Sequence, residues 1–447
     1  MRMPLSECEP TMRFLAGLAL LWLIGLLLGA SMLVYAAYVL FTVFWISRYL
    51  ARRWTESLTA TRNMSANEVV IGTTVGVHIK LENRDRWTIP WVLIDDLLPA
   101  TALFGPPPAL QLDGSNLRMC SVPAKGARLI AYKLKTLRRG YFQIGPAITE
   151  TGDLLGLHRR FRTLTIPAYL LVLPKLIPLA GYDVASRRPV GEVTIAYRLF
   201  EDPTLISGIR QYQNGDPMRS VHWRATARTG QLQSKQYQPT TVAGASIVLD
   251  LHVRSNPDHH EPVRSDLAVT AAASICYTLM QMQQQFGIIT NGRDAADRLA
   301  ESAKSQEFSD LNEARKAVAM QSKSDRLRPI LLQAARGPEH FVHIHKTLAR
   351  LERTDGLPLP ELLLESQNRM PRDATVIVIV QEVDETAALA LGLLRRQGYS
   401  VAAIVNNFDN DALTTAVGRL LAQRIAVYHL LDEDSVPGIC KELMMRY

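Results

Sequence analysis

Cysteine is scarce in this sequence, with four residues in a chain of 447. Cys8, Cys120, Cys276 and Cys440 lie far apart, and no two of them form a C-x-x-C pair. Disulfide frameworks and zinc sites are recognised by close cysteine spacing, so we expect neither of them. This usage favours a reducing compartment.

The sequence motifs of several enzyme classes are also missing. The chain has no G-x-x-x-x-G-K-[ST], no G-x-G-x-x-G and no G-x-S-x-G, so ATP hydrolysis, dinucleotide binding and esterase chemistry have no support. His340, His343 and His345 form a short run without H-E-x-x-H, which we interpret as a helix surface rather than a metal site. We therefore expect no enzyme activity, no cofactor and no bound metal.

Basic residues exceed acidic ones, 50 against 42, which gives a formal net charge of +8. A strongly basic patch would favour nucleic acid, but here the lysines and arginines are scattered along the chain. Membrane proteins with cytoplasmic domains also have an excess of basic residues, which flank their membrane segments. We therefore expect a membrane partner and no nucleic-acid partner.

Charged residues are absent from Phe14 to Ile46. A single transmembrane helix needs about 20 residues, so this run is long for one span and short for two. Gly29 lies near its middle, where a turn would fall, and we predict a transmembrane helical hairpin within residues 1–55. Arg13 before the run and Arg48 after it place both ends in the cytoplasm by the positive-inside rule. One long tilted span, with the soluble part outside, and a cleaved signal peptide are the alternatives.

Short alternating segments follow the apolar run. Residues 69–71, 75–81, 91–96 and 128–134 have the pattern of strands separated by turn residues. We predict an antiparallel, sandwich-like β-rich domain over residues 56–175. The pair Asp95-Asp96 at the end of one strand is interpreted as a solvated strand end.

The C-terminal part has a different pattern, in which apolar strands alternate with amphipathic helices. Residues 245–251, 286–290, 375–380, 401–405 and 425–430 are the expected strands. This alternation predicts an α/β domain with a mostly parallel sheet over residues 241–447, joined to the β-rich domain by a linker at 176–240. Ligands of such sheets bind beyond the carboxyl ends of the strands, where Asp250, Gln381 and Asn406 fall.

The most distinctive stretch runs from Gly208 to Gly230. It contains the patterns R-x-Y-x-x-G-D and H-W-[KR]-x-[ST]-A-R, with a lysine soon after. These features resemble a bacterial membrane-protein family known only as domain of unknown function 58. Residues 139–156 resemble a second stretch of that family, in which Asp153 and Gly156 fit a D-x-x-G pattern. The residues that carry the main signature are Arg210, Tyr212, Gly215, Asp216, Arg219, His222, Trp223, Arg224, Arg228 and Lys235.

The resemblance implies a C-terminal part related to von Willebrand factor type A domains. It also implies a MoxR-type AAA+ ATPase as partner, in chaperone-like assembly or envelope maintenance. The client protein is not indicated. Metal-binding type A domains carry D-x-S-x-S after the first strand, whereas this chain has Asp250 followed by His252 and Arg254 at the serine positions. Too few hard oxygen ligands remain for magnesium, so Asp250 marks a degenerate metal site.

The signature itself is interpreted as a short helix that begins at Asp216-Pro217 and stops at Gly230. It is either an interdomain linker or a binding surface. Trp223 either stacks on Arg219 or packs against the β-rich domain, and His222 is interpreted as a structural residue. The sequence therefore predicts a membrane-anchored, non-enzymatic adaptor in the bacterial inner membrane. A hydrolase that uses the His222 region and a structural envelope protein are the alternatives.

Overall fold

The computed structural model describes most of the chain, and it separates into two compact units. Unit 1 consists of Met1–Lys175, Gly292–Arg328 and His345–Thr354, and unit 2 of Leu176–Asn291, Pro329–Ile344 and Asp355–Tyr447. Each unit is described by itself. The described residues are 8–29, 31–156, 158–180, 201–213, 218–239, 244–298, 307–308, 311–318, 328–371 and 374–440.

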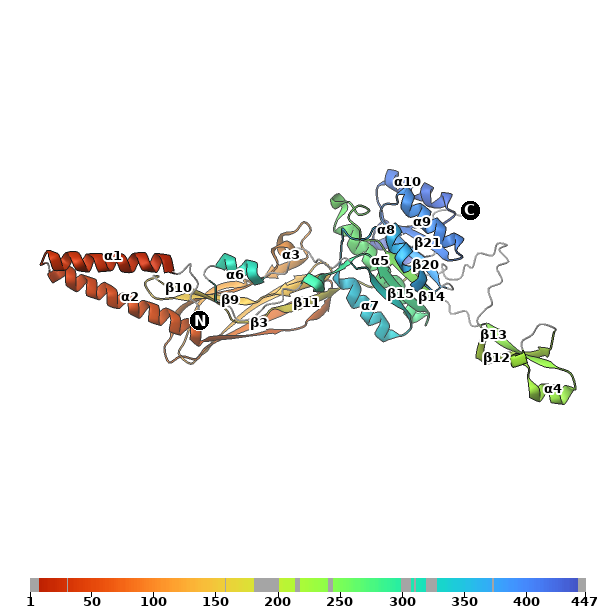
Figure 1. Cartoon of the computed structure of the whole chain (residues 1–447), viewed down its shortest axis with the longest axis horizontal. Coiled ribbons are helices and arrows are strands. Elements are labelled where there is room, and N and C mark those ends of the chain that lie inside the picture. The colour runs from red at the N-terminus through yellow and green to blue at the C-terminus, as the bar shows by residue number, and fades with distance from the viewer. Residues whose placement is uncertain are drawn as a thin grey trace. The chain divides into compact units, whose positions relative to one another are not determined.

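Unit 1 begins with two helices, α1 (Cys8–Leu27) and α2 (Ser31–Ser57), which lie side by side as a hairpin (Figure 1). Gly25 allows their close approach, because a Cβ there would lie 3.1 Å from Cγ2 of Val34. Helix α2 is long and apolar enough to cross a membrane, and Ala16–Leu27 is a shorter apolar helix. The expected apolar N-terminal segment is thus confirmed as helical.

The second half of α2 is part of the β-rich core. Phe44, Ser47, Ala51 and Trp54 are buried at the three- and four-residue spacing of one helix face. The side chain of Trp54, only 3% exposed, packs in one apolar cluster with Leu58, Leu81, Ile89, Val92 and Val122.

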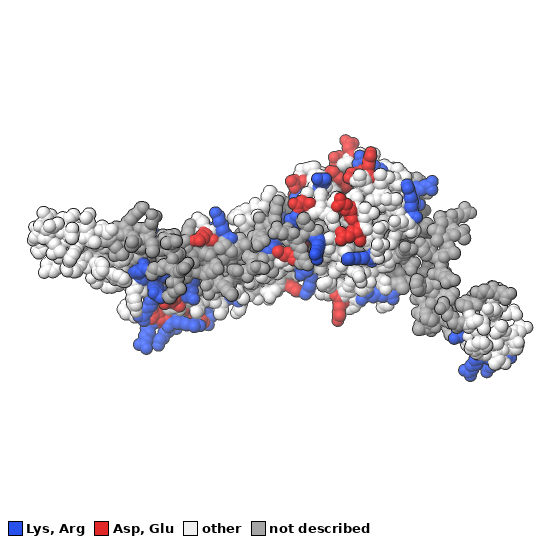
Figure 2. Space-filling model, viewed as in Figure 1, with Lys and Arg blue, Asp and Glu red and all other residues white. Residues whose placement is uncertain are grey.

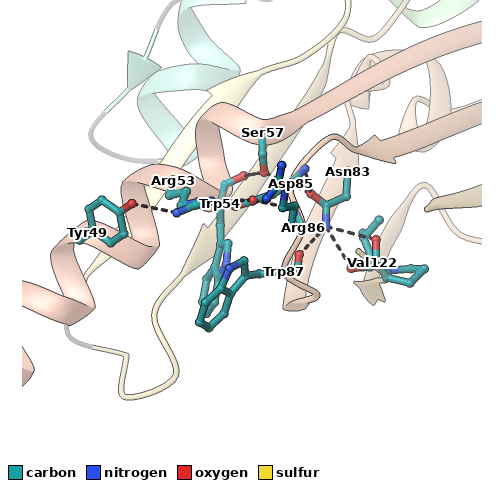
Figure 3. A network of polar contacts seen from close by, with 10 residues as sticks. Tyr49, Arg53, Trp54, Ser57, Asn83, Asp85, Arg86, Trp87 and Val122 are labelled. Carbon is teal, nitrogen blue, oxygen red and sulfur yellow. Dashed lines mark hydrogen bonds and ion pairs between the residues drawn. The ribbon is translucent and has the colours of Figure 1, made fainter. Parts of the chain in front are cut away.

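Polar contacts join the end of α2 to the turn that follows β3 (Figure 3). Arg53 donates to both carboxylate oxygens of Asp85, and its other terminal nitrogen donates to the Tyr49 hydroxyl at 2.8 Å. The hydroxyl of Ser57 donates to Oδ1 of Asn83 at 3.3 Å. The Arg53 guanidinium holds the pKa of Asp85 below its ordinary value. The hairpin and the β-rich part are therefore linked by both apolar and charged contacts.

In the described residues of unit 1, three sheets have three or more strands. Val75, Val77, Ile79 and Leu81 of one strand are buried in alternation, which gives the sheet of that strand an apolar inner face. The predicted antiparallel, β-rich architecture is confirmed for the two larger sheets. The first sheet has the strand order β1 (Leu58–Met64), β3 (Thr74–Asn83), β7 (Ala127–Thr136) and β5 (Leu110–Asp113), and helix α3 (Ala100–Phe104) precedes β5 in the chain. The second has the order β17 (Glu307–Phe308), β10 (Arg159–Thr163), β9 (Ala147–Gly152), β4 (Ile89–Asp96) and β6 (Leu117–Val122). The third has the order β2 (Glu68–Val70), β11 (Ala168–Leu173) and β8 (Gly140–Ile144).

The predicted domain boundaries are wrong in one respect. Residues from the expected α/β domain return to unit 1, where β17 pairs with β10 through Phe308 and Phe161. Arg315 of α6 (Leu311–Val318) forms an ion pair with Asp95 at 2.6 Å, and β16 (Arg293–Asp294) pairs with β19 (Leu351–Glu352). Strands of two residues are too short to produce a recognisable period, so this return could not be predicted from the sequence.

The pair Asp95-Asp96 is buried rather than solvated, which corrects its interpretation from the sequence. Asp96 is fully enclosed and accepts hydrogen bonds from Arg62 and, at 2.6 Å, from the Tyr132 hydroxyl. These partners come from β1 and β7, and they balance the charge that burial would otherwise make costly.

Unit 2 contains a six-stranded sheet in the order β18, β15, β14, β20, β21, β22. All neighbouring pairs are parallel except β15 with β18, so the predicted mostly parallel sheet is confirmed. Residues 330–335 form the antiparallel strand β18. The strands are β14 (Gly244–Leu249), β15 (Gln285–Thr290), β18 (Ile330–Ala335), β20 (Thr375–Val380), β21 (Ser400–Val405) and β22 (Ala426–His429). The helices are α5 (Val263–Gln281), α8 (Leu359–Ser366), α9 (Glu385–Arg396) and α10 (Asn410–Ala422), together with the first half of α7 (Pro338–Arg350), whose residues from His345 on belong to unit 1.

Candidate functional site

Within the linker that was expected over residues 176–240, the signature residues form a small folded element. Strands β12 (Glu201–Gln211) and β13 (Gln233–Pro239) pair antiparallel, and Ile209 lies opposite Lys235. The short helix η3 (Met218–Ser220) and the helix α4 (Trp223–Thr229) lie in the connection between the strands (Figure 1). We call residues 201–239 the signature hairpin.

His222 begins helix α4. Its Nδ1 accepts a hydrogen bond from the backbone nitrogen of Ala225 at 3.1 Å, as an N-cap side chain does. The helix ends at Gly230, whose φ of 68° is the left-handed conformation of a helix C-cap. The predicted stop is confirmed, but the helix begins at Trp223 and not at Asp216-Pro217, which lie outside the described residues. The structural interpretation of His222 is supported.

Small polar and apolar side chains hold the helix to the strands. The hydroxyls of Ser220 and Ser234 lie 3.0 Å apart in a buried position, and Val221 is 2% exposed. The backbone nitrogen of His222 donates to the carbonyl of Gln233 at 2.8 Å. The buried residues of the signature hairpin are thus neighbours of the family-signature residues in the sequence, and not the signature residues themselves.

The pattern residues themselves lie mostly on the outside. Trp223 is 63% exposed, and Met218, Ile209 and Leu232 are also exposed apolar side chains of the same hairpin. Arg224 and Arg228 are exposed, whereas Arg210, Tyr212 and Lys235 are half-buried. Gly215, Asp216 and the side chain of Arg219 lie outside the described residues, so stacking of Trp223 on Arg219 stays a prediction.

Asp250 lies at the carboxyl end of β14, as the sequence predicted. It is 2% exposed, and its carboxylate accepts hydrogen bonds from Ser255 Oγ at 2.6 Å, Asn291 Nδ2 at 2.7 Å and the His252 backbone nitrogen at 3.0 Å. Neither Ser255 nor Asn291 was singled out from the sequence. Only their positions in the sequence could have indicated them, because Ser255 closely follows Asp250 and Asn291 directly follows the neighbouring strand β15.

This arrangement does not fit the divalent cation of metal-binding type A domains. Magnesium needs oxygen ligands with free lone pairs directed at it. Here three donors already occupy the carboxylate of Asp250, and the amide nitrogen of Asn291 faces one of its oxygens. Within the described ranges, no three His, Cys, Asp or Glu side chains gather as a metal site.

The two other strand-end residues, Asn406 and Gln381, differ in their hydrogen bonding. Oδ1 of Asn406 accepts from Arg264 at 3.2 Å, and its Nδ2 donates to the carbonyl of Arg264 at 2.8 Å. The guanidinium of Arg264 also lies 4.2 Å from the ring centroid of Phe408. Gln381 is 1% exposed, and its amide has no hydrogen-bond partner among the described residues. Asn406 is therefore a structural residue of the sheet edge.

Comparison with known proteins bears on the signature hairpin. Residues 208–324 match the sequence model of a family described as protein of unknown function DUF58. The chain thus carries a segment of this family over residues 208–324. An uncharacterized protein, YeaD of Bacillus subtilis (strain 168), is 24% identical over 240 residues, which is 53% of this chain and 57% of YeaD. The chain spans just over half the length of that relative.

Solved structures add little to this assignment. Proximal thread matrix protein 1 from the mussel byssus is 11% identical over 44% of this chain and 46% of its own, with a TM-score of 0.27. The CARDB domain of the PF1109 protein from Pyrococcus furiosus is 9% identical over 26% of this chain and 91% of its own, with a TM-score of 0.18. Scores this low carry no argument about the function of this protein.

Proposed function

We propose that this protein is a membrane-anchored, non-enzymatic adaptor that binds a MoxR-type AAA+ ATPase through the signature hairpin. The joint role is chaperone-like assembly or envelope maintenance. The α/β unit serves as a von Willebrand factor type A-like module that works without a metal. The observation that carries this proposal is the exposure of Trp223, a large aromatic side chain held on a short capped helix.

An exposed tryptophan on a capped helix leaves a large apolar surface in water, which the apolar pocket of a partner would remove from the solvent. Tryptophan and arginine are the residue types that most often dominate protein–protein interfaces. Arg224 is adjacent to Trp223, and Arg228 follows on the same helix, so the aromatic anchor comes with exposed positive charge. An acidic or mixed partner surface with an apolar pocket is the complementary chemistry.

The use of His222 supports an adaptor over a hydrolase. A general base needs a free ring nitrogen near the substrate, and Nδ1 of His222 already accepts the capping hydrogen bond. ATP hydrolysis also needs a phosphate-binding loop, which this sequence does not contain. We infer that the ATPase partner supplies the energy and that this chain supplies the attachment.

The apolar hairpin supports an inner-membrane location. In this proposal α1 and α2 cross the membrane twice, and the basic residues that flank them keep both soluble units in the cytoplasm. A fluorescent-protein fusion at the C-terminus should therefore fluoresce, and an alkaline phosphatase fusion at the same position should be inactive. An active phosphatase there would overturn the cytoplasmic placement.

Binding is tested by co-purification of the tagged full-length protein with the MoxR-type ATPase of the same organism, without nucleotide, with ADP and with a non-hydrolysable ATP analogue. We expect capture in at least one state, and a Trp223→Ala variant should weaken it by at least about tenfold. The matched control is Trp87→Ala, because Trp87 is 60% exposed in unit 1. Absence of capture in every state, or equal capture by both variants, would overturn the proposal.

A further inference from the structure

The turn between β9 and β10 exposes two adjacent leucines. Leu154 is 71% exposed and Leu155 is 65% exposed, in the turn Asp153–Gly156 that we call the leucine turn. Paired large apolar side chains at the tip of a turn carry a solvation cost without a packing role inside the chain. The family resemblance had marked Asp153 and Gly156 of this turn, and the adaptor role does not use them.

The leucine turn is held in one conformation by its own polar groups. The Asp153 carboxylate accepts from the backbone nitrogens of Leu155 at 3.0 Å and His158 at 2.7 Å. The indole nitrogen of Trp91 donates to the Asp153 carbonyl at 3.2 Å, and Gly156 adopts a φ of 71°, which a residue with a Cβ rarely adopts. These contacts keep the leucines directed away from the core of unit 1.

The base of this turn contacts the apolar helix α2. The His158 ring packs edge-on against the Phe44 ring, with 4.8 Å between centroids. Trp45 and Ile46, beside Phe44, are each 52% exposed. Phe44 precedes Arg53 by nine residues, so it lies about 13 Å further along the helix toward the hairpin tip. The leucines therefore extend from the level at which α2 exposes its apolar side chains.

Basic residues lie near the turn and at the end of α2. Arg159 and Arg160 lie three and four residues after Gly156 in the chain. Nη1 of Arg162 donates to the carbonyl of Thr55 at 3.2 Å near the end of α2. Figure 2 shows an uncharged surface along the hairpin and a gathering of Lys and Arg where the hairpin meets the β-rich part. Apolar tips flanked by basic side chains are typical of segments that enter a bilayer with anionic headgroups.

We propose that the leucine turn is a second membrane contact, which places Leu154 and Leu155 at the boundary between headgroups and acyl chains. This inference rests on the membrane anchoring included in the proposed function. A hairpin alone leaves tilt and rotation of its helices open. A second contact beside it fixes how unit 1 is oriented on the bilayer.

The test uses the full-length protein in nanodiscs that contain phosphatidylcholine and phosphatidylglycerol. Single nitroxide labels are attached at Leu154→Cys, at Leu40→Cys in α2 and at Leu129→Cys in β7, with Cys8 and Cys120 replaced by serine. Leu129 is 66% exposed and is the matched control, and Cys276 and Cys440 are buried. Accessibility to oxygen, which enters the bilayer, is compared with accessibility to a water-soluble nickel chelate.

We expect the labels at positions 154 and 40 to favour oxygen and the label at position 129 to favour the nickel chelate. A label at 154 that favours the chelate while the label at 40 favours oxygen overturns the leucine-turn contact and leaves the anchor standing. A label at 40 that favours the chelate overturns the anchor itself. A label at 154 that is shielded from both reagents means that protein covers the turn, and this also overturns the inference.

Discussion

Arg53 donates two hydrogen bonds to the carboxylate of Asp85, from Nε at 2.7 Å and from the terminal nitrogen Nη2 at 3.0 Å. These bonds join the last turns of α2 to the turn after β3. The backbone nitrogen of Lys125 donates a hydrogen bond to the Asp85 carbonyl at 2.9 Å, so the turn that contains Lys125 belongs to the same network. The contacts tie the apolar hairpin to the β-rich part and should give a measurable pH dependence.

Asp85→Asn should lower the thermal unfolding midpoint of the detergent-solubilised protein at pH 7. Because Arg53 holds the pKa of Asp85 below its ordinary value, the pair stabilises the fold above about pH 4, and this contribution is lost as the pH falls through the folded-state pKa. The difference between variant and parent should therefore shrink toward pH 3. The exposed Asp113→Asn is the control, and an equal effect of both variants at pH 7 would contradict this account.

Trp54→Ala should destabilise unit 1 by about 3–5 kcal/mol, because it removes a large side chain from a closed apolar cluster. Trp45 lies on the same helix but is 52% exposed, so Trp45→Ala should change the unfolding free energy by no more than about 0.5 kcal/mol. Chemical denaturation in detergent measures both. Similar values for the two variants would mean that the end of α2 does not belong to the core.

Much of the fold follows from sequence periodicity. The apolar run predicted helices, alternation predicted β3 and β7, and the buried strands of the α/β unit were found because helices separate them. The boundary between the units was not predictable in this way. It depends on strand β17, two residues long, and on the ion pair of Arg315 with Asp95, both of which join residues distant in sequence.

The sequence identified most residues of the candidate site but not how they are arranged. The signature pattern identified Trp223 and His222, but proline chemistry suggested a helix start at Asp216-Pro217. The start lies at His222 because its imidazole caps the helix, and histidine is not among the residues usually expected there. Ser255 and Asn291 were missed because their hydrogen bonds to Asp250 depend on how the strand ends meet in space.

His222→Ala should loosen helix α4 without unfolding the protein. Loss of an N-cap costs about 1 kcal/mol, which corresponds to roughly fivefold faster hydrogen exchange of the amides at Ala225 and Thr226. His222→Asn restores a capping acceptor and should return exchange close to that of the parent. If the alanine variant exchanges like the parent, the ring does not act as a cap.

Magnesium at 10 mM should leave the thermal midpoint of unit 2 unchanged, because a cation that binds the folded state would raise it by mass action. Asp250→Ala should lower the midpoint strongly, since three buried donors lose their acceptor. A rise with magnesium that Asp250→Ala abolishes would contradict the assignment of Asp250 as a structural carboxylate.

Contact of the signature hairpin with the proposed ATPase partner is most directly measured by photo-crosslinking in living cells. A benzophenone amino acid at position 223 should crosslink to the MoxR-type ATPase, and the same probe at position 87, equally exposed in unit 1, should not. A probe at 223 that never captures the ATPase, in cells where both proteins are present at normal levels, would contradict the adaptor function.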